Sequence, residues 1–266
     1  GTYEVYISKL FYMEEIDYKF VHKDFKINGF SIDRERLIIL AVAYVKDGLP
    51  YRKSVGRFLL DWLDDRDYIE ATTSGSTGVP KQIHLKKQGM VNSALATGEY
   101  LKLSPKDRAL LCLPTDFIAG KMMLIRAIVL GLHIDIIRPS SMPLSLTSKD
   151  YDFCAMIPLQ AAKSLTDLPR VKKVILGGAS IDGELEAKLQ NISTEVYSSY
   201  GMTETISHIA MRKVNHTEEH ETTYKAMPNV IFTQDERHCL VINAPLIADH
   251  PVVTNDMVNL ISHNEF

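Results

Sequence analysis

Short apolar runs alternate with stretches of helical periodicity between residues 68 and 201. Six runs read as strands: YIEAT, ALLCLP, HIDIIR, FCAMIP, KKVILGG and TEVYSSYG. Helical patterns at about 87–101 and 120–130 separate some of them, and Asp182 is a candidate N-cap for a helix after KKVILGG. Strands that alternate with helices favour a mostly parallel sheet with helices on both faces. The sequence therefore predicts an α/β fold.

Two other segments flank this region. Residues 33–45 and 54–63 show helical periodicity, and KDGLP breaks the pattern between them. After residue 214 a polar stretch gives way to NVIFT, HCLVINA and MVNLIS, which read as antiparallel strands, with a tight turn at 235–237. We expect a layered α/β core over residues 1–214 and a small antiparallel β subdomain over residues 215–266.

Composition narrows the class of partner. The 266 residues are 45% hydrophobic, which is enough to bury a core. The formal charge of −3 lacks the basic surplus of proteins that bind nucleic acid. The longest apolar run, LIILAVAYV, is far shorter than the roughly 20 residues that span a bilayer. We expect no nucleic acid and no membrane insertion.

The cysteines and the chain ends carry two further expectations. Cys112, Cys154 and Cys239 lie far apart in the sequence within apolar stretches, which favours reduced core thiols and a cytoplasmic location. The chain begins with Gly1 and stops after VNLISHNEF, so we expect it to be part of a longer protein.

The segment TTSGSTGVPKQI, residues 72–83, has the composition of a phosphate-binding loop. The P-loop pattern G-x-x-x-x-G-K-[ST] needs glycine before its lysine and a hydroxyl after it, whereas Pro80 precedes Lys81 and Gln82 follows. That loop type is excluded, although a loop rich in amide donors can still face an anion. A Gly/Ser surface turn is the alternative interpretation.

Two more motifs follow in order, YSSYGMTET at 197–205 and VVTNDMVNL at 252–260. Each adjoins a predicted strand, where α/β sheets bind ligands. Together with the loop, LPTDFIAG at 113–120 and ILGGASI at 175–181, they resemble the adenylate-forming superfamily of acyl-CoA synthetases, luciferases and peptide-synthetase adenylation domains. The resemblance covers roughly residue 68 to the end. It implies an ATP-binding adenylation core that joins a carboxylate to the α-phosphate of ATP and passes the acyl group to a thiol such as CoA.

The resemblance also implies roles for individual residues. The loop would hold the β- and γ-phosphates through small donors and one cation: Thr73, Ser74, Gly75, Ser76, Thr77, Gly78 and Lys81. Tyr200, followed by Gly201, would stack on adenine against a wall of small residues, Gly177, Gly178 and Ala179. Thr203 would donate to the α-phosphate, and Glu204 would bind Mg²⁺, which takes one or two carboxylates and shares its other positions with phosphates and water. The structural alternative is that Thr203 caps a helix and Glu204 lies in its first turn.

Asp256 matches the family aspartate that binds both ribose hydroxyls. The family usually has glycine before this aspartate, where this chain has Asn255; because asparagine tolerates left-handed backbone angles, we expect the turn to survive. An Asn-Asp turn in a surface hairpin is the alternative.

The acyl substrate is the open question. The short segment before the loop, SYGMTETISHIA and LPTDFIAGKMMLIRAIVLG resemble o-succinylbenzoate-CoA ligases of menaquinone synthesis, whose substrate keeps a second, unreacted carboxylate. Residues that could line such a pocket are Phe117, Lys121, Arg126, Ser180, Ser207 and His208. Arg126 and Lys121 lie five apart on one predicted helix, so we expect one of the two to reach the ligand.

Three alternatives or limits stay open. A fatty or aryl acyl-CoA synthetase would need an apolar tunnel in place of a basic pocket, and a non-catalytic nucleotide-binding module would need no turnover. Phe117 stands where relatives often carry an aromatic or histidine gate, so a proton-bearing gate is absent while an apolar lid remains. The resemblance places the family's catalytic lysine in a C-terminal lid domain, and no lysine of this chain can be assigned that role. We therefore expect nucleotide or acyl-adenylate binding with weak adenylation at most. A homodimer is a further expected assembly.

Overall fold

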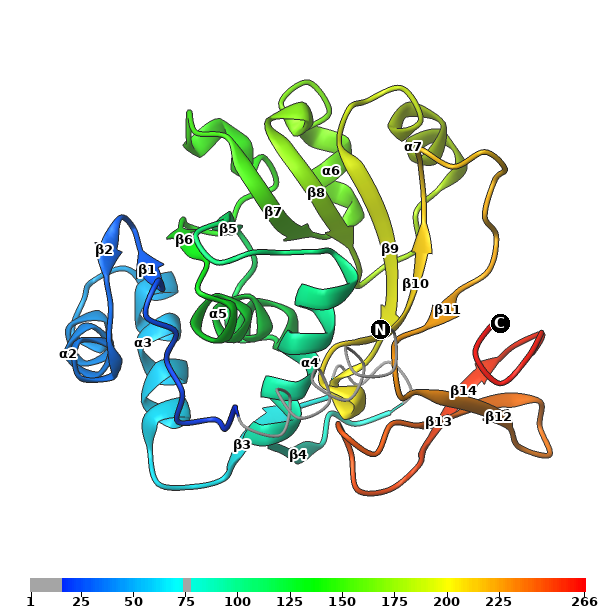
Figure 1. Cartoon of the computed structure of the whole chain (residues 1–266), viewed down its shortest axis with the longest axis horizontal. Coiled ribbons are helices and arrows are strands. Elements are labelled where there is room, and N and C mark those ends of the chain that lie inside the picture. The colour runs from blue at the N-terminus through cyan, green and yellow to red at the C-terminus, as the bar shows by residue number, and fades with distance from the viewer. Residues whose placement is uncertain (1–15, 74–77) are drawn as a thin grey trace, which may run out of the picture.

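The computed structural model describes residues 16–73 and 78–266 (Figure 1). A nine-stranded sheet in the order β11-β10-β9-β8-β7-β5-β6-β1-β2 runs through these residues. Its strands are β1 Lys26–Ile27, β2 Phe30–Ser31, β5 Arg108–Leu111, β6 His133–Ile136, β7 Tyr151–Met156, β8 Val171–Leu176, β9 Glu195–Gly201, β10 His208–Lys213 and β11 Lys225–Ala226. The pairs from β1 through β9 are parallel, whereas β2, β10 and β11 join antiparallel at the two ends. The predicted α/β fold with a mostly parallel sheet is confirmed.

Helices cover both faces of this sheet. They are α2 Arg34–Val45, α3 Pro50–Leu63, α4 Lys87–Tyr100, α5 Ile118–Leu130, α6 Pro158–Lys163 and α7 Gly183–Leu189. Asp182 is the N-cap of α7, as predicted, because its carboxylate accepts a hydrogen bond from the Leu185 amide at 2.8 Å. Figure 1 shows α4 and α5 together on one side of the sheet and α6 and α7 toward the other. The short α6 was not predicted.

Alternate residues of the central strands separate two cores. Ala109 and Leu111 of β5 pack with α4 and α5, while Leu110 packs on the opposite face with residues of α6 and α7. The two-residue period of a strand produces this division, and the continuous apolar runs of the sequence are those of strands buried on both faces. The carboxyl ends of β8 and β9 are thereby fixed between two packed layers.

Two smaller sheets lie apart from the large one. β3 Tyr68–Thr72 pairs with β4 Gln82–Lys86 as an antiparallel hairpin, so the strand before the phosphate loop does not belong to the main sheet. The second small sheet joins β12 Ile231–Gln234, β13 Cys239–Asn243 and β14 Val252–Met257.

The prediction of a third antiparallel strand at MVNLIS was wrong. β14 ends at Met257, so the motif VVTNDM is itself the strand, and the turn expected at Asn255 does not exist. Asn255 therefore needs no left-handed backbone angle, and Asp256 projects from a strand. The predicted turn at 235–237 is present, closed by the Asp235 amide donating to the Cys239 carbonyl at 3.0 Å. The separate sheet begins at Ile231, since β11 still belongs to the large sheet; the division at residues 214 and 215 stays a proposal.

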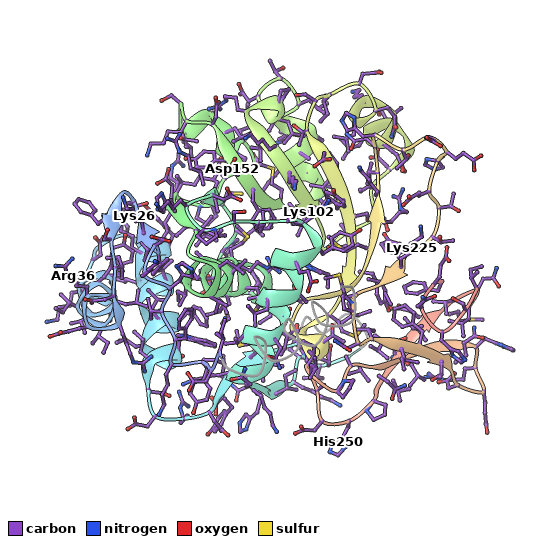
Figure 2. The ribbon with its side chains drawn as sticks, in the orientation of Figure 1. Lys26, Arg36, Lys102, Asp152, Lys225 and His250 are labelled. Carbon is purple, nitrogen blue, oxygen red and sulfur yellow. The ribbon has the colours of Figure 1, made fainter. Side chains whose placement is uncertain are left out.

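The cysteines are free and buried, although two of them are neighbours in space. Cys112 Sγ and Cys154 Sγ lie 3.6 Å apart on adjacent strands. No helix of the described residues is long and apolar enough to cross a membrane. Polar side chains such as Arg36 on α2 and His250 after β13 point outward (Figure 2).

A buried lysine ties the start of α4 to the end of α3. Lys87 is fully buried, and its Nζ donates to Asp64 Oδ1 at 2.9 Å and to the Asp64 carbonyl at 3.2 Å. Arg66 Nε donates to the other oxygen of Asp64 at 2.8 Å. Burial raises the pKa of Asp64, but the hydrogen bonds from Arg66 and Lys87 outweigh it and lower the pKa to about 2.

We predict that this pair makes the fold acid-sensitive. A carboxyl with a folded pKa near 2 and an unfolded pKa near 4 contributes stability above pH 4 that is lost as the pH falls toward 2. After allowance for partial exposure the contribution is about 1 kcal/mol. The free energy of unfolding, measured by urea titration between pH 2 and 5, should fall more steeply in the wild type than in Asp64→Asn. Asp65→Asn, which changes the exposed neighbouring carboxyl, is the control and should keep the wild-type slope.

Candidate nucleotide and acyl site

Two residues from different motifs meet at the end of β9. The Tyr200 hydroxyl donates to Asp256 Oδ2 at 2.5 Å, although the two residues are 56 positions apart. Tyr200 belongs to the large sheet and Asp256 to the small one, so this bond links the two sheets. Burial and the hydrogen bond to Asp256 raise the pKa of Tyr200. The expected adenine-stacking ring and ribose-binding carboxylate are therefore next to each other.

Aromatic rings hold Tyr200 in place. The Phe266 ring packs edge-on against it with 5.0 Å between ring centroids, and the Tyr224 ring lies at 6.1 Å. Tyr224 in turn shares a 2.7 Å hydrogen bond with Ser198 of β9. These contacts fix the ring of Tyr200 before any ligand binds.

Small residues follow the neighbouring strand β8. The Gly177 amide donates to the Met156 carbonyl at 3.1 Å, and a Cβ at Gly177 would lie 2.5 Å from Ser199 Oγ. Gly178 has φ +83°, a conformation that glycine adopts without strain. Gly178, Ala179 and Ser180 are exposed. The strands β8 and β9 are adjacent, so this backbone and Tyr200 end at the same edge of the sheet.

The described ends of the predicted phosphate-binding segment continue the β3–β4 hairpin. The Thr73 amide donates to the Lys81 carbonyl at 2.8 Å, and the Lys81 amide donates to Thr73 Oγ1 at 2.9 Å, which extends the hairpin by one pair. The Lys81 side chain is exposed, as is Gly78. Four of the predicted phosphate-binding residues lie outside the described residues: Ser74, Gly75, Ser76 and Thr77.

Thr203 and Glu204 form a short 3-10 turn, η3 Thr203–Thr205, directly after β9. Among the described residues, no hydrogen bond or ion pair engages the Glu204 carboxylate, and no group of three or more metal-ligating side chains gathers anywhere. Such a lone carboxylate fits a Mg²⁺ ion that takes its remaining ligands from phosphates and water. Thr203 is the first residue of this turn and Met202 occupies the cap position, so the structure does not support the alternative in which Thr203 is the cap.

A buried polar chain runs from α5 through β10 to α4. Arg126 is 3% exposed, and its Nη2 donates to Ser207 Oγ at 2.7 Å. Ser207 Oγ lies 3.3 Å from His208 Nδ1, and His208 Nε2 lies 2.9 Å from Thr97 Oγ1, which donates to the Ser93 carbonyl at 3.1 Å. All four bonds can be made at once if each group donates to the next, which requires a neutral His208 with its proton on Nε2. The predicted pocket residues Arg126, Ser207 and His208 are thus in contact.

Arg126 lacks a charged partner. No carboxylate of the described residues forms an ion pair with it, and its Nε has no hydrogen-bond acceptor. Burial lowers the pKa of Arg126 to about 10, so it stays charged at neutral pH. An uncompensated buried cation is costly for a fold. It is the arrangement expected of a site that receives an anion.

The other predicted pocket residues lie elsewhere. Lys121 Nζ donates to the Thr115 and Asp116 carbonyls at 2.8 and 3.1 Å, and burial lowers its pKa. Phe117 precedes the first residue of α5 and is 66% exposed. Neither side chain joins the Arg126 group in the ligand-free structure.

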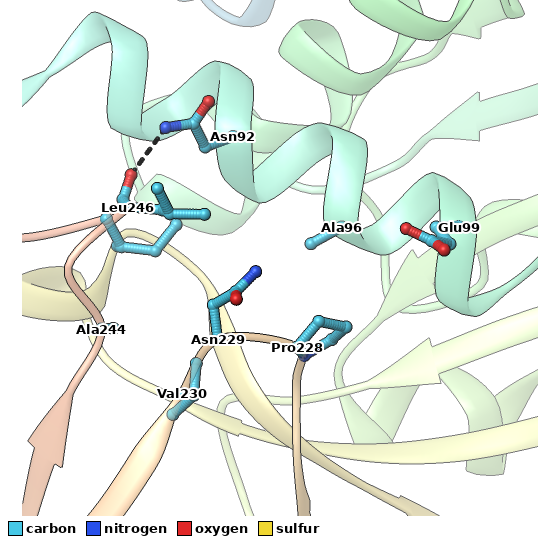
Figure 3. Close-up of a pocket in the computed structure, with 9 residues that line it drawn as sticks. Asn92, Ala96, Glu99, Pro228, Asn229, Val230, Ala244 and Leu246 are labelled. Carbon is cyan, nitrogen blue, oxygen red and sulfur yellow. Dashed lines mark hydrogen bonds between the residues drawn. The ribbon is translucent and has the colours of Figure 1, made fainter. Parts of the chain in front are cut away.

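Two surface hollows of the described residues are lined by neither Tyr200, Arg126 nor His208. One lies between α4 and the segments that flank the small sheet, where Asn92 Nδ2 donates to the Leu246 carbonyl at 2.8 Å (Figure 3). The other lies at the ends of β5 and β6 beside Ser54 and Thr115. Within the Arg126 group, Ser207 is partly exposed, whereas Arg126 and His208 are buried.

Comparisons with known proteins agree with this geometry. The family of AMP-binding enzymes matches residues 71–233, and the chain belongs to that family. An acyl-CoA synthetase (AMP-forming)/AMP-acid ligase II-like protein from Dyadobacter fermentans has a similar structure, with 35% identity and a TM-score of 0.75 over 85% of this chain and 67% of that one. The O-succinylbenzoate coenzyme A synthetase of Bacillus subtilis, solved with ATP and magnesium ion, shares the fold at 22% identity, with a TM-score of 0.60 over 68% of this chain and 42% of that one.

Curated relatives differ in activity. The 2-succinylbenzoate–CoA ligase of Salmonella typhimurium is 26% identical over 173 residues, which are 64% of this chain and 38% of that protein. The nonribosomal peptide synthetase gliP of Aspergillus fumigatus is 29% identical over 153 residues, 55% of this chain and 7% of that protein. The chain thus spans well under half of the curated relatives that it matches.

Sequence analysis did not identify several residues of the site. Thr97, in the last turn of α4, connects His208 to the Ser93 carbonyl, and nothing in ALATGEY marks it. Tyr224 and Phe266 support Tyr200 from segments that carry no motif. These roles depend on tertiary contacts, so only the structure could reveal them.

We predict that His208 stays neutral well below the pH at which free histidine titrates. Burial and the nearby charge of Arg126 lower its pKa well below 6.5. Because the unfolded chain takes up this proton first, the contribution of His208 to stability is lost as the pH falls below about 6.5. Ring NMR signals of His208 should show the neutral Nε2–H form at pH 6. His208→Gln should flatten the stability curve between pH 5 and 7; an imidazolium signal at pH 6 would contradict the assignment.

Proposed function

We propose that the chain forms the nucleotide- and acyl-binding part of an ATP-dependent carboxylate–CoA ligase whose acyl substrate carries a second carboxylate, in the manner of o-succinylbenzoate. The observation that carries this proposal is Arg126, a buried and charged guanidinium that no carboxylate of the described residues neutralises. A spectator carboxylate on the substrate would supply the missing charge.

The neighbouring residues support a spatial arrangement of the substrate groups along the site. Tyr200 and the backbone of Gly177 and Gly178 would enclose adenine, and Asp256 would exchange its Tyr200 hydrogen bond for the ribose hydroxyls. Thr203 and Glu204 follow Tyr200 by a few residues, so the α-phosphate and its Mg²⁺ would lie between the adenosine and the acyl group. Magnesium would neutralise phosphate charge there; the chain's own part is to hold and orient the carboxylate.

Ser207 would hold and orient the guanidinium of Arg126, and the substrate carboxylate would add to this hydrogen bond without replacing it. The Ser207 hydroxyl accepts a hydrogen bond from Nη2, while Nε has no acceptor among the described residues and is left for a carboxylate, which accepts charge-assisted N–H donors well. His208, held neutral, would leave the positive charge of the pocket on Arg126 alone. A long-chain fatty acid has no second carboxylate besides the one that reacts, so the charge of Arg126 does not support the fatty acyl-CoA synthetase alternative.

The remaining parts of the proposal concern the whole protein. We infer ATP, Mg²⁺ and CoA as co-substrates and a cytoplasmic location. Homodimerisation stays a prediction. Pyrophosphate exchange separates a ligase from a non-catalytic nucleotide-binding module: carboxylate-dependent exchange above that of Glu204→Gln favours the ligase, and nucleotide binding without exchange in the full-length protein favours the module.

The Arg126 proposal predicts opposite effects of one substitution on stability and on ligand choice. Arg126→Met removes an uncompensated buried charge, so the ligand-free protein should be as stable as the wild type or more stable. The same variant should lose roughly tenfold or more of its preference for the charged ligand.

Thermal-shift titration measures both effects. The ligands are non-hydrolysable acyl-AMP mimics that carry o-succinylbenzoyl, its methyl ester, acetyl or a long-chain acyl group on one adenosine. At a hundred times Kd a ligand stabilises the native state by about 2.7 kcal/mol, which is enough to rank them. Arg212→Met removes a buried cation that Glu186 already pairs, at 2.5 Å, and is the control that should keep the ranking. An unchanged ranking in Arg126→Met would sink the dicarboxylate proposal.

A further inference from the structure

The backbone between Glu204 and Ser207 contains a sharp and unusual turn. Ile206 has φ +69° and ψ −57°, and the Ser207 amide donates to the Thr205 carbonyl at 2.7 Å. These values define a γ-turn of the rare positive-φ form, which is strained for residues other than glycine. A β-branched side chain makes this conformation a clear outlier.

Surrounding contacts keep Ile206 in this conformation. Its side chain is 1% exposed, and its Cδ1 lies 2.9 Å from the point where a Cβ at Gly89 would stand. Thr205 Oγ1 bonds to the Met202 amide at 3.0 Å and to the Ser207 carbonyl at 2.9 Å, which closes the turn from both sides. Strain that neighbours enforce in this way is concentrated at functional sites.

The turn determines where the next side chain points. It reverses the chain between η3 and β10, and the residue that leaves it, Ser207, presents its hydroxyl to Arg126 and to His208. With a relaxed backbone at residue 206, the Ser207 hydroxyl would leave the line between those two side chains. Thr203 and Glu204 lie at the other end of the same turn.

We propose that the γ-turn at Ile206 is a strained positioning element that holds the Ser207 hydroxyl on Arg126, and that it thereby makes the acyl pocket selective for an anionic substrate. This inference rests on the function proposed above. Ile206 acts through Ser207 and touches no substrate, so it is a positioning residue.

Strain at Ile206 is tested by comparing two small substitutions. At an ordinary buried position glycine is less stable than alanine. At residue 206 the order should reverse, because glycine adopts a positive φ freely, so Ile206→Gly should need more urea to unfold than Ile206→Ala. The same pair at Ile209, which is equally buried but lies in β10, is the control and should keep the normal order. A normal order at both positions would overturn the strain.

Selectivity is tested with the o-succinylbenzoyl mimic of acyl-AMP and its methyl ester. The ratio of their affinities should fall roughly tenfold in Ile206→Gly, to the level of Ser207→Ala, and stay near the wild-type ratio in Ile206→Val. The double variant that combines Ile206→Gly with Ser207→Ala should lose no more selectivity than Ser207→Ala alone, since both substitutions act through one hydroxyl. A ratio that survives in Ile206→Gly would overturn the inference.

If the proposed function is wrong, the wild type itself should show no preference between the two mimics, whereas failure of the turn inference leaves that preference intact. In the first case the NMR signal of the His208 ring still tests the turn without any ligand. If the turn positions Ser207, the His208 Nδ1 signal should change in Ile206→Gly and in Ser207→Ala but not in Ile206→Val. An unchanged signal in Ile206→Gly would show that the turn does not hold Ser207.

Discussion

The candidate site depends on how closely the chain returns on itself after β9. Gly201 pairs with His208, and the Ser207 carbonyl occupies the space that a side chain at Gly201 would need. β9 is the last parallel strand of the run that starts at β1, and β10 runs antiparallel to it. Because the chain leaves β9 and enters β10 at the same edge of the sheet, the residues that lie at that edge include Tyr200, Thr203, Glu204 and Ser207. A parallel continuation would have carried the chain away from this edge through a long crossover.

The buried charge of Arg126 is the second constraint. α5 is apolar on all sides because it packs between the sheet and α4, and the single guanidinium in it has a hydroxyl as its best partner. Folding alone gives no reason to keep such a group, since an apolar side chain of similar size would pack there without the cost of desolvation. Its presence is most simply explained by a ligand that neutralises it, and the neutral His208 beside it avoids a second charge.

Much of the fold could be predicted from the sequence, because strands buried on both faces leave continuous apolar runs. The large sheet, the helices at 34–45 and 87–100, and the N-cap at Asp182 all follow from such patterns. The hairpin of β3 and β4 could not be separated from the main sheet, since sequence periodicity does not show which sheet a strand joins. The two-residue strands β1 and β2 were missed, although Asn28 and Gly29 between them carry the residue pair that favours a tight hairpin. For the site, the motifs identified the residues, while the strained turn at Ile206 and the bond from Tyr200 to Asp256 depend on tertiary contacts.

The bond between Tyr200 and Asp256 also has a mechanical meaning. The two residues belong to separate hydrogen-bonded ladders, and the segment 263–266 also connects the two sheets, since it accepts backbone hydrogen bonds from Ala226 of β11 and from Phe232 of β12. An adenosine that lay on the ring and held the carboxylate would replace one short bond by a bridge with several contacts. Bound nucleotide would thus add to the contacts between the two sheets, so the small sheet should open less readily with nucleotide than without it.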